Sequence, residues 1–269
     1  MAVLGLAWAL ALAGSALAAK SNDRQSVSKA DQALFRGLSH ASTAAVGRLL
    51  DPKFTWTDVE GRTLGLKAVL KGPPKPGAQV GANLTLHLYG DVAVITTELE
   101  HIHALRVWVR GNTGWRALLY QEVKVEDASS STGKKIESDC DNPCHTIPYT
   151  PRTAAERDVI ASWQALESAV AKGDATAWAT HVADEFTVVS GARVEDKATR
   201  MAAVGRGGSA PPPLVSATLY DFNDAVVMTC LHQSYLGKPV HISRVWIKRE
   251  GAWLLAVSYQ TVVQAAKVG

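Results

Sequence analysis

One motif occurs twice in this chain. Residues 106–110 read Arg-Val-Trp-Val-Arg and residues 244–248 read Arg-Val-Trp-Ile-Lys, and each is followed five residues later by another Trp. The two motifs lie 138 residues apart (244 minus 106), whereas the Tyr-Gln pairs at 120–121 and 259–260 lie 139 apart, which indicates one inserted residue. Solenoid repeats span about 20–50 residues, so an offset this long predicts two copies of a whole domain.

The N-terminal segment has the features of a secretory signal. Residues 1–19 carry no charged side chain and end in an Ala-x-Ala pattern of small residues. We expect cleavage after Ala18 or Ala19. An uncleaved anchor helix is the alternative, although its Ala and Gly content makes the segment weakly hydrophobic. The prediction is a secreted or periplasmic protein with no stable membrane span after cleavage.

Composition is typical of a folded chain and argues against one class of partner. The remaining 250 residues (269 minus 19) are enough for two domains that each bury a core. Apolar residues make up 47% of the chain and charged residues 20%. The net charge is only +3, and no basic run is interleaved with aromatic residues, so we expect no nucleic-acid partner.

Two of the three cysteines lie close together in the sequence. Cys140 and Cys144 flank the turn-forming residues Asp-Asn-Pro, and in an oxidising compartment this spacing favours a local disulfide. A metal site that uses both cysteines and His145 is the alternative, but a second ligand pair is missing. Cys230 lies in an apolar strand and is interpreted as a small buried hydrophobic residue. We predict no metal and no cofactor.

The order of secondary-structure signals is the same in both copies. Thr153 and Glu156 have the spacing of a capping box, and apolar residues then recur on one helical face until Gly173. Asp174 can cap the helix that follows. A poorer helical pattern covers residues 27–38. An Asp and Phe pair, a short helix and a Pro/Gly loop follow in each copy, and long alternating strands come last. The predicted class is α+β, with two tandem domains that each pack N-terminal helices on a curved antiparallel sheet.

Composition also suggests the boundaries of these units. The predicted organisation is a signal peptide at 1–19, a first domain at 20–126, a linker at 127–152 and a second domain at 153–269. The linker is rich in Ser, Lys, Asp, Asn and Pro and contains the predicted disulfide.

Three segments carry a resemblance to a known superfamily. They are Asp-Glu-Phe at 184–186, Leu-Tyr-Gly-Asp-Val-Ala-Val at 88–94, and the second Trp motif at 244–253. They resemble the nuclear-transport-factor-2-like (NTF2-like) superfamily, the cone-shaped fold shared with ketosteroid isomerase and SnoaL-like cyclases, and in particular its bacterial members of undescribed function. The resemblance implies a pocket between the concave sheet and the helices, and sheet-to-sheet packing, here as an internal pseudo-dimer. It does not imply one activity, because the superfamily includes enzymes, binding modules and inert scaffolds.

The resemblance also suggests which strand face looks into the cone. In the superfamily it is the face that carries the Ser243 position. Alternation along the strand places His241 on the same face, and its repeat partner is His103. Histidine exchanges protons near neutral pH, so His241 and His103 are the candidate catalytic residues. Core or pocket-lining histidines are the alternative.

Several further residues are candidates for ligand binding. They are Trp56, Asp58, Gln121, Ser243, Tyr259 and Gln260. Gln121 and Gln260 occupy the last-strand position where the superfamily often has a polar pocket residue. The Tyr259 hydroxyl could donate to an oxyanion, and Trp56, which has no repeat partner, would shape one pocket only. Asp58 is the only candidate for the carboxylate base of ketosteroid isomerase.

These residues leave three functions open. The first is an exported protein that binds a small, largely apolar molecule in one or both cones. The second is a lyase or isomerase that uses a pocket histidine as general base. Ketosteroid isomerase chemistry itself is disfavoured, because the second copy has Ser190 at the position of Asp58 and neither copy matches the Tyr/Asp pair of that enzyme. The third is a structural or partner-binding module whose cones are filled by side chains.

Overall fold

The computed structural model describes residues 4–77, 83–126, 140–208, 210–233 and 238–264, with side chains from residue 21 onward. The first half contains α1 (Leu4–Ser39), α2 (Thr43–Leu49), β1 (Leu50–Thr57), β2 (Thr63–Gly65), α3 (Leu66–Lys71), β3 (Thr85–Tyr89), β4 (Val92–Leu99), β5 (Ile102–Gly111) and β6 (Gly114–Lys124). The second half contains α4 (Ala154–Lys172), α5 (Ala175–Thr180), β7 (Val182–Ser190), β8 (Arg193–Asp196), α6 (Lys197–Gly205), β9 (Leu214–Asp221), β10 (Ala225–His232), β11 (Val240–Arg249) and β12 (Ala252–Val262).

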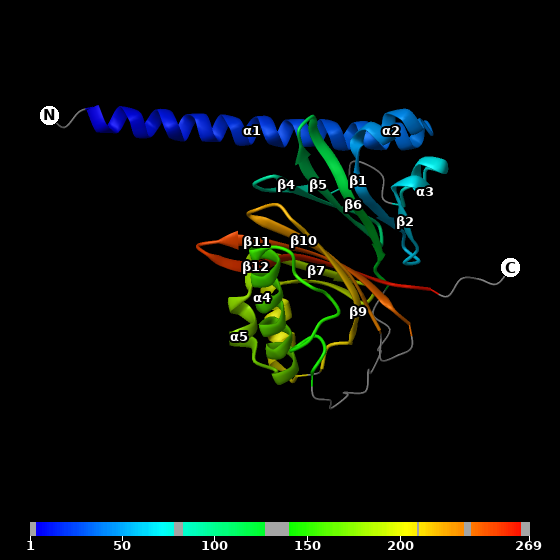
Figure 1. Ribbon diagram of the computed structural model, residues 1–269, viewed down its shortest axis with the longest axis vertical. Coiled ribbons are helices and arrows are strands. Elements are labelled where there is room, and N and C mark those ends of the chain that lie inside the picture. Colours follow the sequence, from blue (N-terminus) through cyan, green and yellow to red (C-terminus); the bar gives the residue numbers. More distant parts are fainter. Residues whose placement is uncertain (1–3, 78–82, 127–139, 209, 234–237, 265–269) are drawn as a thin grey trace.

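The two halves have the same topology. Each contains a six-stranded sheet, in the order β2-β1-β6-β5-β4-β3 in the first half and β8-β7-β12-β11-β10-β9 in the second. In Figure 1 the elements form four layers, with α1 and α2 outside the first sheet and α4 and α5 outside the second. The predicted fold class, two similar α+β units in tandem, is therefore confirmed.

The helix boundaries in the second half follow from local capping. The Thr153 side chain accepts a hydrogen bond from the Glu156 backbone N–H and starts α4. Gly173 ends this helix with φ of 71°, a left-handed conformation that glycine adopts without steric cost. The Asp174 side chain then accepts from the Ala177 N–H and starts α5. These three boundaries agree with the sequence prediction.

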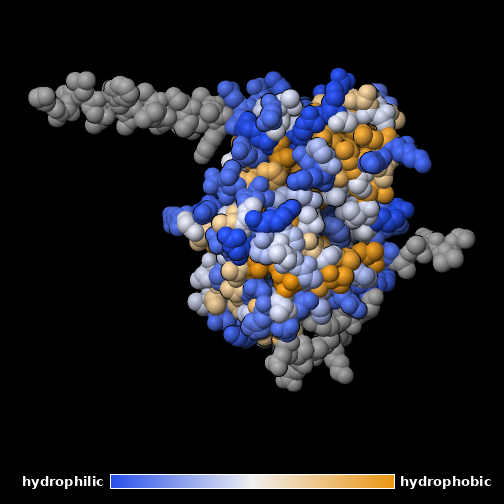
Figure 2. Space-filling model, in the orientation of Figure 1, coloured by the Kyte–Doolittle hydropathy of each residue, from blue (hydrophilic) through white to orange (hydrophobic). Residues whose placement is uncertain are grey.

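The two sheets pack face to face and share one core. Val107, Val227 and Val245 belong to this core, and all three are 0% exposed. The arrangement is the internal pseudo-dimer that the resemblance implied, and it explains why both faces of the long strands are apolar. Hydrophilic residues cover most of the molecular face shown in Figure 2, with smaller hydrophobic areas between them.

The other face of each sheet looks toward the helices. Trp246 lies in the core that α4 and α5 cover, and alternation along β11 puts Arg244 on the same side. His241 and Ser243 instead share the sheet-to-sheet face with Val245. The prediction that the Ser243 face looks into the cone is therefore wrong. Stacked sheets lie only about 10 Å apart and accommodate Val and Ala, whereas the wider space under the helices accommodates Trp and Arg.

The strand register also corrects the repeat. Arg106 pairs with Tyr120 in the first half, and Arg244 pairs with Ser258 in the second, so the structural offset stays at 138 (258 minus 120). The predicted inserted residue is therefore wrong. Relative to the repeated Arg, the Tyr-Gln pair lies one residue further along β12 than along β6. Because successive side chains alternate, Tyr120 faces the helices while Tyr259 faces the other sheet.

The described part of the predicted linker packs on the second half. The disulfide between Cys140 and Cys144 is present, with a Cα–Cα distance of 5.4 Å, which confirms the prediction. Between them, the Asn142 amide donates to the Leu214 carbonyl and accepts from the Leu214 N–H, both at 2.9 Å. This two-point contact attaches the disulfide loop to the start of β9. Residues 127–139 of the predicted linker lie outside the described residues.

Helix α1 includes residues 4–19 of the predicted signal segment without a break; residues 1–3 lie outside the described residues. Its N-terminal part extends beyond the first sheet in Figure 1. Described side-chain contacts begin with Asp23, which pairs with Arg110 at 2.5 Å, and Arg24, which donates to the Leu86 carbonyl at 2.8 Å. Within the described ranges, no helix combines the length and the apolar character needed to cross a membrane.

A chain that begins at Lys20 should fold as the full chain does. Among the described side chains of α1, the first buried one is Val27, which is 0% exposed, so removal of residues 1–19 should change the free energy of unfolding by no more than about 0.5 kcal/mol. Urea denaturation of the two chains measures this difference. As a control, deletion of residues 1–34 removes Val27, Asp31 and Leu34 and should unfold the first half. A large loss of stability in the shorter truncation would contradict the prediction.

Candidate functional site

Aromatic side chains fill the interior of the first cone. Trp56 stacks on Tyr120 with ring centroids 3.7 Å apart and planes inclined by 11°. The Tyr120 hydroxyl donates to Glu122 at 2.5 Å, and the Gly77 N–H donates to the same carboxylate at 2.6 Å. A Cβ at Gly77 would lie 3.2 Å from the Glu122 carboxylate oxygens, so glycine allows this close approach. Gly77 thus lies against the carboxylate that accepts from Tyr120.

The second cone has small residues at the two corresponding positions. Trp56 pairs with Tyr120 across β1 and β6, and Val188 pairs with Ser258 across β7 and β12. Replacement of two aromatic rings by Val and Ser accounts for a cavity of about 200 Å³. Its wall is mainly apolar and consists of Leu166, Val170, Trp178, Phe186, Val188, Ala210, Pro211, Pro212, Val240, Ile242 and Leu255. The polar residues that line it are Glu167, Arg200, His232, Arg244, Ser258 and Gln260.

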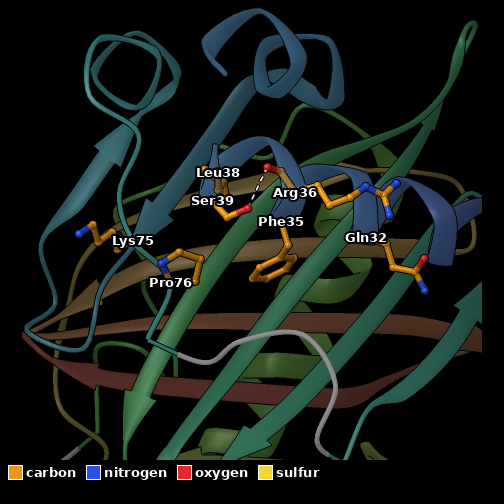
Figure 3. Close-up of a pocket in the computed structure, with 7 residues that line it drawn as sticks. All are labelled: Gln32, Phe35, Arg36, Leu38, Ser39, Lys75 and Pro76. Carbon is orange, nitrogen blue, oxygen red and sulfur yellow. Dashed lines mark hydrogen bonds between the residues drawn. The ribbon is translucent and has the colours of Figure 1, made fainter. Parts of the chain in front are cut away.

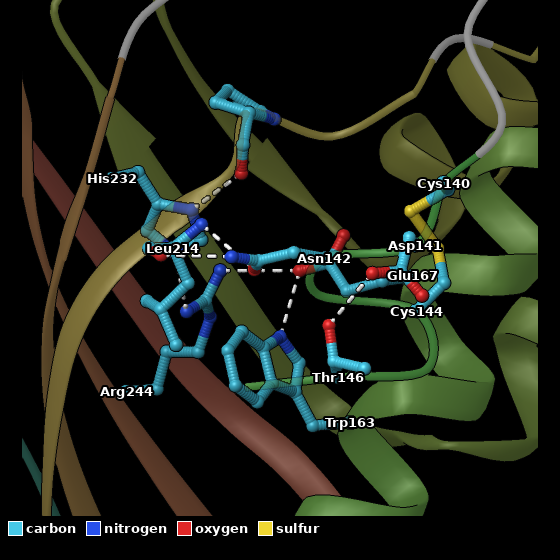
Figure 4. The surroundings of a disulfide bond; sticks show 11 residues. Cys140, Asp141, Asn142, Cys144, Thr146, Trp163, Glu167, Leu214, His232 and Arg244 are labelled. Atoms are coloured by element: carbon cyan, nitrogen blue, oxygen red, sulfur yellow. Dashed lines mark hydrogen bonds and ion pairs between the residues drawn. A yellow bond between two sulfur atoms is a disulfide. The ribbon is translucent and has the colours of Figure 1, made fainter. Parts of the chain in front are cut away.

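A buried ion pair lines one side of this cavity. Arg244, only 5% exposed, donates from Nη2 to Glu167 Oε1 at 3.2 Å, and Trp163 Nε1 donates to the same oxygen at 2.8 Å. The guanidinium also lies over the Trp163 ring, 5.1 Å from its centroid. Figure 4 shows the three side chains converging. Because Glu167 is held by two donors, it is a counter-ion here and not a free proton acceptor.

His232 and Cys230 complete this cluster as uncharged groups. His232 Nδ1 lies 2.8 Å from the Pro212 carbonyl, which can only accept, so Nδ1 carries the proton and Nε2 faces Arg244 Nη1 at 3.4 Å. Burial, and then the Arg244 charge, lower the pKa of His232 to about 3. Burial raises the pKa of Cys230 to about 11, although Arg244 donates to its sulfur at 3.1 Å. At neutral pH the cluster therefore contains neither imidazolium nor thiolate.

The first half contains a related ion pair with the helix residues in reverse order. Arg106 Nε lies 2.7 Å from Asp31 Oδ1, and the guanidinium lies 4.9 Å from the Phe35 ring centroid. Acid precedes aromatic in α1, whereas the aromatic Trp163 precedes the acid Glu167 in α4. Burial raises the pKa of Asp31, against the opposing effect of Arg106. Each half thus buries one Arg against an acid and an aromatic ring spaced four residues apart.

Most of the residues predicted for the site lie between the sheets. His241, His103, Ser243, Tyr259 and Gln121 all occupy the sheet-to-sheet face, so their predicted placement at a cone pocket is wrong. Burial lowers the pKa of His241 to about 4 and also lowers the pKa of His103. Burial raises the pKa of the Tyr259 hydroxyl. The physical reason is the packing of the two sheets, which removes this face from solvent.

Gln121 connects the two halves. Its Nε2 lies 3.2 Å from the His241 carbonyl, 3.1 Å from the Tyr259 carbonyl and 2.9 Å from Thr261 Oγ1. Thr261 Oγ1 in turn donates to the Glu122 carbonyl at 2.7 Å. These contacts bridge sheets from different halves, which is a structural role for an amide that was predicted to bind a ligand.

The three remaining predicted residues occupy different surroundings. Trp56 is part of the aromatic stack that fills the first cone. Asp58 accepts from the Glu60 and Arg62 N–H groups, both at 3.0 Å, and pairs with the Arg62 side chain at 2.8 Å, so its carboxylate stabilises the turn after β1. Of all the predicted residues, only Gln260 lines the second cavity in the described part of the chain.

Sequence reasoning missed the residues that give this cavity its charge. Arg244 was part of the repeated motif, and its recurrence as Arg106 was an available signal for a buried cation. Arg200 and His232 have no comparable signal, because they approach the cavity from α6 and β10 only in the folded chain. Among the described residues, no three His, Cys, Asp or Glu side chains are grouped as a metal site.

Two other hollows border the fold. One, of about 550 Å³, lies between the end of α1 and the loop before Gly77, and Phe35 points from α1 toward the strands beside it (Figure 3). Its other lining residues are Gln32, Arg36, Leu38, Ser39, Lys75 and Pro76. The other, of about 600 Å³, lies between the halves and shares Val240 and Gln260 with the second cavity.

Solved structures of other proteins resemble parts of this chain. An NTF2-like protein from Cytophaga hutchinsonii is 16% identical and covers 41% of this chain and 99% of its own, with a TM-score of 0.37. An NTF2-like protein from Rhodospirillum rubrum is 21% identical and covers 39% of this chain and 98% of its own, with a TM-score of 0.33. The association domain of C. elegans CaMKII is 15% identical and covers 40% of this chain and 95% of its own, with a TM-score of 0.32. NTF2-like proteins are thus among the structures similar to this chain, as the sequence resemblance predicted. No protein-family model and no curated protein matches the chain.

Proposed function

We propose that this chain binds a small, largely apolar molecule in the cavity of its second cone. The observation that carries the proposal is the 200 Å³ cavity, which has a mainly apolar wall and a few buried polar groups. Ligand sites are generally concave and apolar, with a small number of polar groups that orient the ligand. Drug-sized ligands occupy about 300–1,000 Å³, so this cavity suits a smaller molecule. In the first cone the stacked Trp56 and Tyr120 rings occupy the equivalent space.

The chemistry of the cavity favours binding over a lyase or isomerase reaction. A general base works best with a pKa near the operating pH. His232 has a pKa of about 3, and Arg244 faces its free nitrogen. Glu167 is held by Arg244 and Trp163. His241, the base predicted from the sequence, lies between the sheets with a pKa of about 4.

The protein is proposed to work outside the cytosol. Two observations support export. The apolar segment at 1–19 has the composition of a secretory signal, and a disulfide of the Cys140–Cys144 kind persists in oxidising compartments.

A cavity-filling variant tests the binding proposal. Val188→Trp combined with Ser258→Tyr copies the aromatic pair of the first cone into the second, and should abolish ligand binding because the added rings occupy the cavity. Overpacking costs about 1–3 kcal/mol, so folding is checked by circular dichroism. Native mass spectrometry after gentle purification should show a small bound mass on the wild-type chain and on the control Ser258→Ala, and none on the filled variant. A wild-type chain without bound mass, or equal retention by the filled variant, would refute the proposal.

A further inference from the structure

One cation at the second cavity is only partly neutralised. Arg200, on α6, lines the cavity, and its side chain is 25% exposed. Its ion-pair contact is with Glu195, with Nη1 and Oε2 3.5 Å apart, at the long limit of a hydrogen bond. The same Glu195 oxygen lies closer, at 3.1 Å, to Arg193 Nε. Glu195 therefore serves two guanidinium groups.

The other charged groups around the cavity do not compensate for Arg200. Arg244 is matched by Glu167, and His232 is neutral. Counted over the described ion-pair network that includes the lining residues, three guanidinium groups (Arg193, Arg200 and Arg244) stand against two carboxylates (Glu167 and Glu195). Burial, and then repulsion from Arg193, lower the pKa of Arg200, against the opposing effects of Glu195 and Glu167.

We propose that the ligand of this cavity carries a single carboxylate, which pairs with Arg200 while the apolar part of the molecule packs on Trp178 and Phe186. This inference rests on the proposed function and adds the chemical class of the ligand. The planar guanidinium can donate two parallel hydrogen bonds to a carboxylate. The Ser258 hydroxyl and the Gln260 amide supply further donors along the same lining. A single excess positive charge matches a monocarboxylate rather than a dicarboxylate.

The size of the cavity limits the apolar part. A volume of about 200 Å³ suits short aliphatic or single-ring acids and excludes long acyl chains. The test therefore uses small acids, each paired with its uncharged primary amide, which has nearly the same shape: butyrate with butanamide, hexanoate with hexanamide, and benzoate with benzamide.

Isothermal titration calorimetry of the full chain at pH 7 measures the preference within each pair. At least one acid should bind about tenfold more tightly than its amide, which corresponds to about 1.4 kcal/mol. Arg200→Met should remove this preference by weakening the acid alone, and Arg200→Lys should retain part of it. The matched control is Arg206→Met, because Arg206 is exposed at the end of the same helix and does not line the cavity; this variant should keep the preference.

Three results would overturn the inference: amides that bind as tightly as their acids, an unchanged preference in Arg200→Met, or no acid bound at all. The cavity-filling variant separates these results from failure of the proposed function. If the wild-type chain carries a bound mass that the filled variant loses, the cavity binds a ligand, and only the inference that this ligand carries a carboxylate is rejected. If neither chain carries a ligand and no acid binds, both proposals fail.

Discussion

Replacement of Arg244 by methionine should lower the free energy of unfolding by about 3–5 kcal/mol. Arg244 is 5% exposed and is the cation opposite Glu167, which is 7% exposed. Methionine fills much of the same volume but leaves a buried carboxylate with only the Trp163 N–H as donor. Such an uncompensated charge costs far more than a lost surface contact. Urea denaturation with linear extrapolation measures the change.

A double variant identifies the cause of that loss. Arg244→Met combined with Glu167→Leu removes both charges and should recover most of the stability, because an apolar pair avoids the desolvation cost. The surface pair of Arg62 and Asp58 is the control: the Arg62 side chain is 70% exposed, and Arg62→Met should cost at most about 1 kcal/mol. If Arg244→Met costs less than the surface variant, the ion pair does not have the importance assigned to it.

Acidification from pH 6.5 to pH 4 should destabilise the protein by several kcal/mol. His232 and His241 have pKa values of about 3 and about 4 in the folded chain, because burial disfavours the charged ring. In the unfolded chain both titrate near 6.5, so the unfolded state binds more protons throughout this interval and stability falls as the pH falls. For His241 the loss is about 3 kcal/mol, at about 1.4 kcal/mol for each pH unit. The free energy of unfolding at a series of pH values measures it.

The slope, rather than the absolute stability, tests the assignment to His241. His241→Gln removes the titrating group and should flatten the decline between pH 6.5 and 4, even if the substitution itself costs stability. Carboxylates also titrate in acid, but they contribute equally to both chains and cancel in the comparison. A slope that is the same in His241→Gln and wild type would show that burial of this ring does not cause the acid sensitivity.

Local signals predicted the elements of this fold well. The capping residues Thr153 and Asp174, the glycine at 173 and the disulfide between Cys140 and Cys144 depend on residues a few positions apart, so a single sequence contains the information. The Trp repeat extended these elements to two similar halves. The site was predicted less well, because it depends on which strand face meets the helices. Both faces of β11 are apolar, and alternation alone does not distinguish them.

The repeated Trp motif by itself determined that two α+β units share one chain, because such a pattern requires the same local structure in both copies. Tertiary structure alone decided that the sheets pack against each other, which buries Ser243 and Gln121 and partly buries His241. It also decided that Val188 and Ser258 leave space in the second cone where Trp56 and Tyr120 fill the first. These outcomes depend on side chains that are far apart in the sequence, and a one-residue shift in register reverses which face each side chain occupies.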